Sequence, residues 1–240
     1  MPLAKRIIPI LLCRGRQLVK GVAFNSWRSV GVAAQAVRIH QARGVDELVL
    51  LDISATAEGR GPDLKLVEEL TKDCFMPLAV GGGVRTVEDV KTLLRAGADK
   101  VVIRTGGTEL VRQVAEVVGR QAIVAAIDVP GTGPSVYEDP EQWARCAKHW
   151  MNAGAGELLV TRMGREGTMQ GYDLDLIKAV SRAVTIPVIA HGGAGTYQHM
   201  LEAIEAGADA VAAGSIFLFT EATPRGAAEY LAQHGVEARV

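Results

Sequence analysis

Residues 96–99 read Ala-Gly-Ala-Asp, and the same four residues return at 206–209, 110 positions further along the chain. The two stretches belong to a longer repeat, in which residues 44–105 align with residues 154–215 without a gap. Other matching pairs are Gly82-Gly83 with Gly192-Gly193 and Pro77 with Pro187. A period of 110 residues is too long for a solenoid unit and is close to half of the 240-residue chain. The repeat therefore predicts a fold made of two duplicated halves.

Short apolar runs alternate with amphipathic helical stretches along both halves. Runs that are apolar on both faces are typical of a parallel sheet covered on both sides. They are Arg6–Leu12, Glu47–Asp52, Leu78–Val80, Lys100–Arg104, Ala122–Asp128, Glu157–Thr161, Val188–Ala190 and Ala210–Gly214. The helical stretches are Gly31–Ala42, Asp63–Thr71, Val87–Ala96, Thr108–Val118, Pro140–Ala153, Asp173–Ala183, His199–Ala206 and Arg225–Gln233. This alternation predicts one α/β domain over residues 1–240, a (β/α)8 TIM barrel built from two half-barrels.

Composition narrows the classes of partner. A net charge of -1 with no basic stripe argues against nucleic acid as the main partner. The apolar runs are too short to span a bilayer, and we expect neither membrane association nor an export signal. Three widely spaced cysteines, Cys13, Cys74 and Cys146, suit a reducing cytoplasm and match no zinc spacing. We expect no metal site and no cofactor.

The repeat also predicts where anions bind. Active sites of such barrels lie at the carboxyl ends of the strands, where glycines let backbone N–H groups approach a phosphate. The first half places Gly82, Gly83 and Thr105 there, and the second half places Gly193, Gly214 and Ser215 there. Two related clusters predict two phosphate sites across one barrel mouth, and hence a substrate with a phosphate at each end.

Acidic side chains follow two of the predicted strands. Asp128 ends the fifth strand and Asp52 ends the second. A carboxylate after so apolar a run points to function, because a buried unpaired charge is costly. The position that matches Asp128 in the first half is Leu12, which cannot transfer a proton. His191, where the seventh strand meets Gly192, is either a polar mouth residue or a structural hydrogen-bonding group.

Nearly the whole chain resembles the cyclase subunit (HisF-type) family of imidazole glycerol phosphate synthase. The blocks that carry the resemblance are Ala4–Ile8, Val19–Gly21, Asp46–Ile53, Val80–Gly83, Ala96–Val101, Gly154–Glu157, Gly167-Thr168, Gly171–Asp173 and Gly192–Gly195. The resemblance implies an enzyme of histidine biosynthesis that takes ammonia from a separate glutaminase. That ammonia serves to cyclise a bis-phosphorylated formimino-ribulosyl carboxamide, giving imidazole glycerol phosphate and an aminoimidazole carboxamide ribotide.

The resemblance also assigns roles to residues of this chain. It implies that Asp128 is the general acid or base. The substrate and phosphate positions it implies are Lys20, Asp52, Gly82, Gly83, Thr105, Gly167, Gly193, Gly214 and Ser215. A charged ring at the barrel floor, the expected ammonia gate, consists of Arg6, Glu47, Lys100 and Glu157. Asp99 matches a residue of the glutaminase interface, so a heterodimer partner is expected at the N-terminal face.

Four departures from the family pattern keep the reaction open. Leu12 replaces the aspartate of strand one, Arg162–Gly167 alters an Asp-Arg-Asp-Gly loop, Val129–Tyr137 is shorter than the family's hairpin, and Arg104 replaces an asparagine. Ile8–Leu12 and Asp73–Pro77 look more like a side branch associated with glutamine-dependent amidination of surface-polysaccharide sugars. Three hypotheses follow: a synthase subunit of that branch, a working or weakened cyclase, and a non-catalytic phosphate-binding barrel that activates a glutaminase. A sugar-phosphate isomerase is a weaker alternative, since it too needs paired acids.

Overall fold

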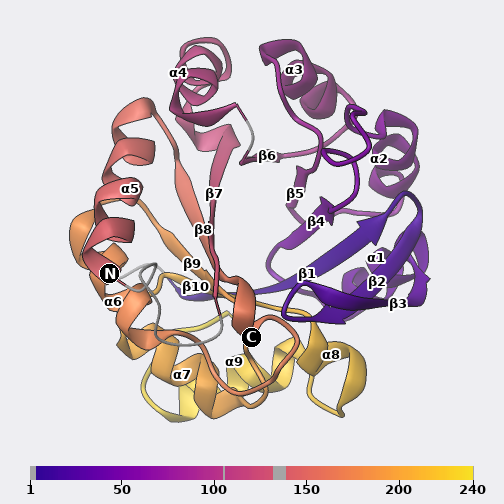
Figure 1. Ribbon diagram of the computed structural model, residues 1–240. Coiled ribbons are helices and arrows are strands. Elements are labelled where there is room, and N and C mark those ends of the chain that lie inside the picture. The colour runs from indigo at the N-terminus through magenta and orange to yellow at the C-terminus, as the bar shows by residue number, and fades with distance from the viewer. Residues whose placement is uncertain (1–3, 105, 132–138, 240) are drawn as a thin grey trace.

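The described part of the chain, residues 4–104, 106–131 and 139–239 of a computed structural model, forms a closed parallel barrel (Figure 1). Its strands follow one another around the ring in chain order. They are β1 (Arg6–Arg14), β4 (Leu48–Asp52), β5 (Leu78–Gly81), β6 (Lys100–Ile103), β7 (Ile123–Val129), β8 (Glu157–Arg162), β9 (Val188–His191) and β10 (Ala210–Ala213). The ring closes because β10 pairs with β1 in parallel, with Arg6 opposite Ala210. The predicted (β/α)8 barrel is confirmed.

Helices cover the outside of this ring (Figure 1). They are α1 (Ala33–Ala42), α2 (Leu64–Thr71), α3 (Val87–Arg95), α4 (Gly107–Val118), α5 (Pro140–Ala153), α6 (Leu174–Ala183), α7 (Tyr197–Glu205), the short α8 (Ser215–Phe219) and α9 (Pro224–Gln233). Successive strand residues point to opposite faces: Leu48 and Leu50 pack under the helices, and Val49 packs inside the barrel. The strands are therefore apolar on both faces, as the sequence predicts.

The duplication is visible in equivalent aspartates that accept backbone hydrogen bonds at the starts of helices and strands in the two halves. Asp63 caps α2 by accepting a hydrogen bond from the Leu66 backbone N–H at 3.0 Å, and Asp173 caps α6 in the same way. Asp99 accepts from the Leu78 N–H at 2.9 Å, and its counterpart Asp209 accepts from the Val188 N–H at 3.1 Å. Equivalent carboxylates thus satisfy equivalent backbone donors in both halves.

One segment differs from the sequence prediction. A helix was expected from Gly31, with no strands between β1 and that helix. Instead an antiparallel hairpin of β2 (Gln17–Val22) and β3 (Asn25–Val32) extends β1, and α1 begins only at Ala33. The turn takes positive φ at Ala23, Phe24 and Ser26. Hairpin turns are usually predicted from Asn-Gly or glycine, which adopt positive φ readily. This turn has other residue types at those positions, so the sequence did not predict it.

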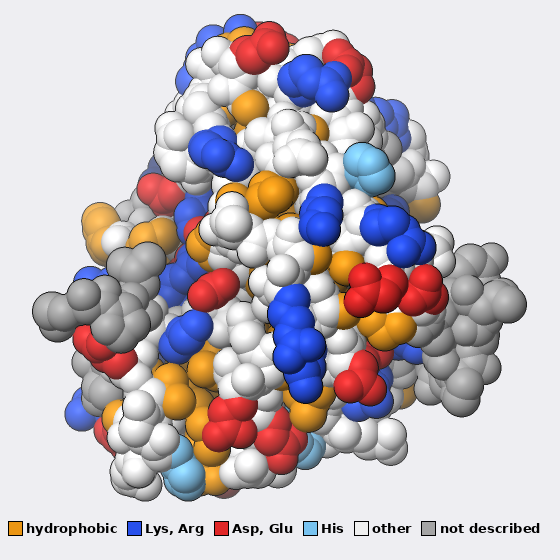
Figure 2. Space-filling view, turned by 90° about the vertical axis from the view of Figure 1, so that its left-hand side faces the viewer, with side chains coloured by type: hydrophobic (Ala, Val, Ile, Leu, Met, Phe, Trp, Pro, Cys, Tyr) orange, Lys and Arg blue, Asp and Glu red, His pale blue; other side chains and the backbone are white. Residues whose placement is uncertain are grey.

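The outer surface carries mixed charge. Figure 2 shows the face around α5 and α6, where basic and acidic side chains are interspersed with small apolar patches. Such a mixture creates no extended field of one sign. No helix in the described ranges has the length and apolar character needed to cross a membrane.

Candidate active site at the barrel mouth

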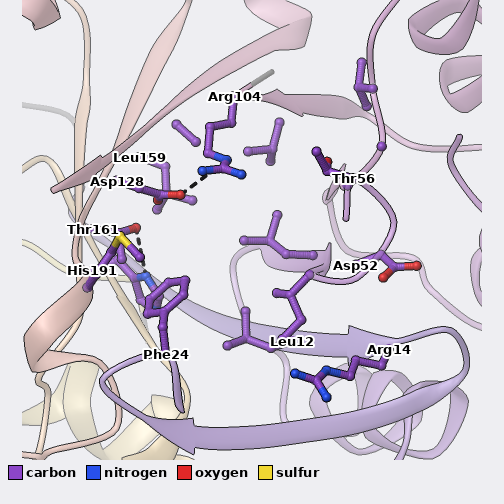
Figure 3. Close-up of a pocket in the computed structure, with 18 of the residues that line it drawn as sticks. Leu12, Arg14, Phe24, Asp52, Thr56, Arg104, Asp128, Leu159, Thr161 and His191 are labelled. Atoms are coloured by element: carbon purple, nitrogen blue, oxygen red, sulfur yellow. Dashed lines mark hydrogen bonds and ion pairs between the residues drawn. The ribbon is translucent and has the colours of Figure 1, made fainter. Parts of the chain in front are cut away.

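A cavity of about 310 Å³ opens at the carboxyl ends of the strands (Figure 3). Its walls come from almost every part of the mouth, including Leu12 of β1, Asp52 of β4, Arg104 after β6, Asp128 of β7, Thr161 of β8 and His191 of β9, together with Arg14, Phe24 and Trp27 of the hairpin region. The position agrees with the rule that barrel active sites lie at this end.

Asp128 is the acid that this cavity presents most directly. In Figure 3 its carboxylate points toward Arg104, whose Nε lies 3.5 Å from Oδ2. Burial raises the pKa of Asp128 above its ordinary value. Arg104, His191 and a hydrogen bond with Thr161 oppose part of that rise. A carboxyl group with a raised pKa keeps its proton to higher pH than an ordinary aspartate, as is common at acid–base sites.

The other two candidates for acid chemistry differ from Asp128. Leu12 lies across the cavity in Figure 3, where its apolar side chain is buried with the barrel interior. Asp52 is committed to a turn: Oδ1 accepts from the Ser54 N–H at 3.0 Å, and Oδ2 pairs with Arg60 at 2.7 Å. An ion-paired carboxylate that also holds a turn is a poor substitute for a missing general acid.

The glycines of the first half line the cavity. Gly82 and Gly83 have φ of +114° and +72°. A Cβ on Gly82 would lie 2.4 Å from the backbone oxygen of Asp52. Glycine is therefore required here by the backbone path itself. Thr105, the third member of this predicted phosphate site, lies outside the described residues.

The glycines of the second half lie beside the cavity and do not form its wall. A Cβ on Gly193 would lie 2.1 Å from the oxygen of Gly171. Gly214 lies against Lys20, whose Nζ would be 2.6 Å from a Cβ placed there. Ser215 is buried next to Gly214, and its Oγ has no hydrogen-bond partner among the described residues. The structure thus brings Lys20, Gly214 and Ser215 together, apart from Gly82 and Gly83.

Lys20 and Gly167, which were expected to be substrate-binding residues, do not line the mouth cavity. Lys20 is 1% exposed and pairs with Glu166, a residue of the loop after β8. Gly167 packs that same loop on the hairpin, since a Cβ there would lie 2.1 Å from the oxygen of Gly21. Lys20 therefore ties the hairpin to the second half of the barrel. Lys20 and Glu166 are 146 residues apart, and no sequence pattern predicts that they pair.

The four charged residues of the barrel floor meet in one closed ring. Arg6 Nη1 lies 2.5 Å from Glu47 and 3.2 Å from Glu157. Lys100 Nζ lies 3.0 Å from Glu47 and 3.1 Å from Glu157. Burial lowers the pKa of Arg6, but the two glutamates outweigh it, and the pKa is raised overall. Each charge of the ring is thus balanced by two opposite neighbours.

An apolar layer separates this ring from the mouth cavity. Ile8, Val49, Ala79 and Ala210 line the barrel interior, and each is 0% exposed. Because no water-sized molecule reaches these side chains, the axis is closed at this level. Passage along it would require side chains to move.

Asp99 lies on the opposite side of the barrel from the mouth, where it is exposed beside a surface hollow. The hollow is also lined by Cys74, Phe75 and Met76. Phe75 is 83% exposed, which is unusual for so large an apolar side chain. Sequence reasoning assigned a role to Asp99 here and none to Phe75, which it named only within the segment Asp73–Pro77.

The hairpin supplies mouth residues that sequence reasoning also missed. The rings of Phe24 and Trp27 pack edge to face, with centroids 6.0 Å apart. The Arg14 guanidinium lies 5.3 Å from the Trp27 ring. A basic and two aromatic side chains around one predicted strand end could have drawn attention to the segment. Among the described residues, no group of three or more histidine, cysteine or carboxylate side chains is placed to hold a metal ion.

Fold and site together define a (β/α)8 barrel with its candidate active site at the carboxyl ends of the strands and a charged ring at its floor. The family model described as "Histidine biosynthesis protein" matches residues 6–223. The chain is 43% identical to imidazole glycerol phosphate synthase subunit HisF of Exiguobacterium sibiricum, over 99% of this chain and 100% of the relative. It is also 43% identical to the same subunit of Thermococcus gammatolerans, over 99% of each chain. The chain belongs to the histidine biosynthesis protein family, among HisF-type subunits.

Proposed function

We propose that this chain is the ammonia-using cyclase subunit of an imidazole glycerol phosphate synthase, acting in histidine biosynthesis. The observation that carries the proposal is the presence, in one barrel, of a raised-pKa carboxyl group at the mouth and a closed charged ring at the floor. The names of its relatives, which are subunits of that synthase, support the choice of reaction.

The substrate fits the mouth through its two phosphates. Gly82 and Gly83 line the cavity, and their backbone serves one phosphate. For the second phosphate we assign Lys20, which lies against Gly214, and the neighbouring Ser215, whose buried hydroxyl has no hydrogen-bond partner among the described residues. Between these clusters Asp128 takes and returns protons as the imidazole ring closes.

Ammonia enters from the floor. Arg6, Glu47, Lys100 and Glu157 hold the axis shut in the isolated chain, and closed buried ion pairs are weak stabilisers that suit a gate. A glutaminase docked on the N-terminal face, around Asp99 and Phe75, opens the ring and delivers ammonia to the barrel interior. Phe75 provides the large apolar anchor that protein interfaces favour.

A second candidate is favoured by Leu12. A cyclase that uses two opposed acids lacks one of them here, and Arg104 adds a cation beside the remaining one. A synthase subunit for glutamine-dependent amidination of a surface-polysaccharide sugar keeps the same ammonia route and a different substrate. A barrel that binds phosphates and only activates its glutaminase needs no acid at all.

Turnover of the bis-phosphorylated substrate with an ammonium salt tests the proposal without the partner. We expect turnover by the unaltered chain and a loss of at least about 100-fold in Asp128→Asn. Asp73→Asn, which changes an exposed carboxylate paired with Arg38, is the matched control and should keep full activity. Absence of turnover in the unaltered chain contradicts the cyclase assignment. The amidination candidate is then assayed on a nucleotide-linked sugar with the glutaminase and an amidotransferase component.

A further inference from the structure

Three polar side chains form one row at the mouth. Asp128 of β7 is paired in register with Thr161 of β8, and Thr161 is paired with His191 of β9. Neighbouring residues of parallel strands point to the same face, and all three line the mouth cavity (Figure 3). Thr161 Oγ1 lies 3.1 Å from His191 Nδ1, and Thr161, the register neighbour of Asp128, helps to hold down the pKa of that acid. One hydroxyl therefore connects the acid to the imidazole.

The imidazole is supported from behind by a buried charge pair. His191 Nε2 lies 3.2 Å from Glu166 Oε2, within ion-pair distance. The other oxygen of Glu166 pairs with Lys20. Burial raises the pKa of Glu166, but the two facing groups lower it more, so its pKa lies well below the usual range and the residue is ionised. His191 thus faces a permanent negative charge.

The hydrogen positions follow from what each group can donate. A carboxylate only accepts, so we assign the proton of the neutral imidazole to Nε2, the nitrogen that lies 3.2 Å from Glu166. When the imidazole is neutral, its Nδ1 has no proton and accepts the single proton of the Thr161 hydroxyl. When the imidazole is protonated, Nδ1 donates to Thr161, and the hydroxyl proton turns to Asp128. The charge state of His191 therefore sets the direction of the hydrogen bond that reaches Asp128.

We propose that His191 is a proton store for Asp128, coupled to it through the Thr161 hydroxyl, and that it replaces the acid–base capacity absent at Leu12. Protonated Asp128 gives its proton to Oγ1 of Thr161 as the existing Oγ1–H bond breaks and that proton forms an N–H bond on Nδ1. Asp128 ends as a carboxylate, Thr161 as a hydroxyl and His191 as an imidazolium whose charge Glu166 balances. The reverse transfer recharges Asp128. His191 is a positioning residue here, and the inference rests on the proposed acid–base role of Asp128.

The other groups around His191 do not compete for this proton. Arginine and lysine keep their charge near neutral pH, which covers Lys20 on the hairpin, Arg162 at the end of β8 and Arg104 after β6. Burial raises the pKa of Tyr172 further above its ordinary value, and its hydroxyl donates to the Ala212 carbonyl at 3.1 Å. Histidine is the residue type that ordinarily titrates near neutral pH. Asp128, with its raised pKa, is the acid connected to it.

The first test needs no substrate. The side-chain nitrogen signals of His191, assigned by their loss in His191→Gln, are titrated by nuclear magnetic resonance in the whole protein. Because coupled groups titrate as a pair, Asp128→Asn should move the His191 midpoint by roughly one pH unit, and Thr161→Val should abolish most of this response. Exposed His149 is the internal control. A His191 midpoint that both variants leave unchanged overturns the proposal.

The second test is the pH profile of ammonium-dependent turnover. We expect His191→Gln and Thr161→Val to lower kcat by about 10- to 100-fold with little change in KM, and to remove one limb of the profile. Thr161→Ser, which keeps the hydroxyl, should restore both. Unchanged profiles in an active protein contradict the proton store. If the unaltered chain does not turn over, the proposed function fails, and the titration decides the coupling by itself.

Discussion

The two halves of the barrel share a scaffold and differ in the chemistry of their mouths. Asp63 and Asp173 cap equivalent helices, and Asp99 and Asp209 hold equivalent backbone donors. At the mouth, the first half carries Leu12 near the end of β1, whereas the second half carries Asp128 near the end of β7. The comparison teaches that duplication preserved what the backbone requires, while side chains that face the substrate were free to diverge.

The divergence concentrates reactive groups on one side. Asp128, Thr161 and His191 stand on successive strands of the second half, and Glu166 lies behind them. The first half contributes Lys20, which reaches across from the hairpin to Glu166. The first half's side of the cavity carries Leu12, Leu51 and Ile53 together with the polar Arg14 and Asp52.

Restoring symmetry at the mouth should have the largest effect. If the rest of the site is intact, Leu12→Asp should raise ammonium-dependent kcat by about 100-fold or more, since one general acid–base group contributes that much. The rate is measured with the bis-phosphorylated substrate. Leu12→Asn, of the same shape but unable to transfer a proton, should give no gain. Equal rates in the two variants would point to a different substrate.

Substituting the two glutamates of the floor ring should have unequal effects on stability. Glu47 is 3% exposed and pairs with both cations, so Glu47→Ala should lower the free energy of unfolding by about 3 kcal/mol. Glu157 is 15% exposed, so Glu157→Ala should lower the free energy of unfolding by less than Glu47→Ala does. Urea unfolding measures both. In the double variant, glutamine-dependent turnover should fall or uncouple from glutamine hydrolysis, while ammonium-dependent turnover changes little. Loss of both activities together would argue against a gate.

A buried histidine in the outer helices of the first half should make the stability of the protein sensitive to acid. His40 of α1 is 4% exposed, and Trp150 occupies the position 110 residues later in α5. Burial lowers the pKa of His40 to about 4. The unfolded chain takes up this proton near pH 6.5 and the folded chain only near pH 4. The stabilisation is therefore complete above about pH 6.5 and declines as the pH falls toward 4.

The contribution of His40 is measured by urea unfolding at several pH values. Between pH 7 and 4.5 the free energy of unfolding should fall by about 2 kcal/mol because of this residue. His40→Phe should flatten that slope, and exposed His149→Ala should leave it unchanged. An equal slope in His40→Phe would show that the acid sensitivity arises elsewhere.

The smallest expected effect compares two matched carboxylates of the floor. Asp99→Ala and Asp209→Ala each remove a hydrogen bond to a backbone N–H, which should cost about 1 kcal/mol, and Asp209→Ala also removes a partly exposed ion pair with Lys5. If the glutaminase docks beside Phe75, only Asp99→Ala should also weaken its binding, measured by titration calorimetry. Equal binding by both variants would place the partner elsewhere.

The sequence by itself determined the architecture and several site residues. The ungapped 110-residue repeat, the apolar runs and the glycine positions are local or periodic signals, and they predicted the barrel and nearly all of its strands. Asp128 could be named because it follows an apolar run, and Arg6, Glu47, Lys100 and Glu157 were assigned through the family resemblance. A closed barrel then brings strand ends together by geometry alone.

Only the tertiary structure decided which side chains contact one another at the mouth. The hairpin turns at Ala23 and Phe24 without a glycine signal, so its strands were invisible to pattern reading. Lys20 and Glu166 are separated by 146 residues, and their pairing depends on that hairpin folding across the barrel. His191 could be placed at a strand end, but its choice of Glu166 and Thr161 follows from register between strands. Such long-range contacts are set by packing, which a single sequence does not encode in any local period.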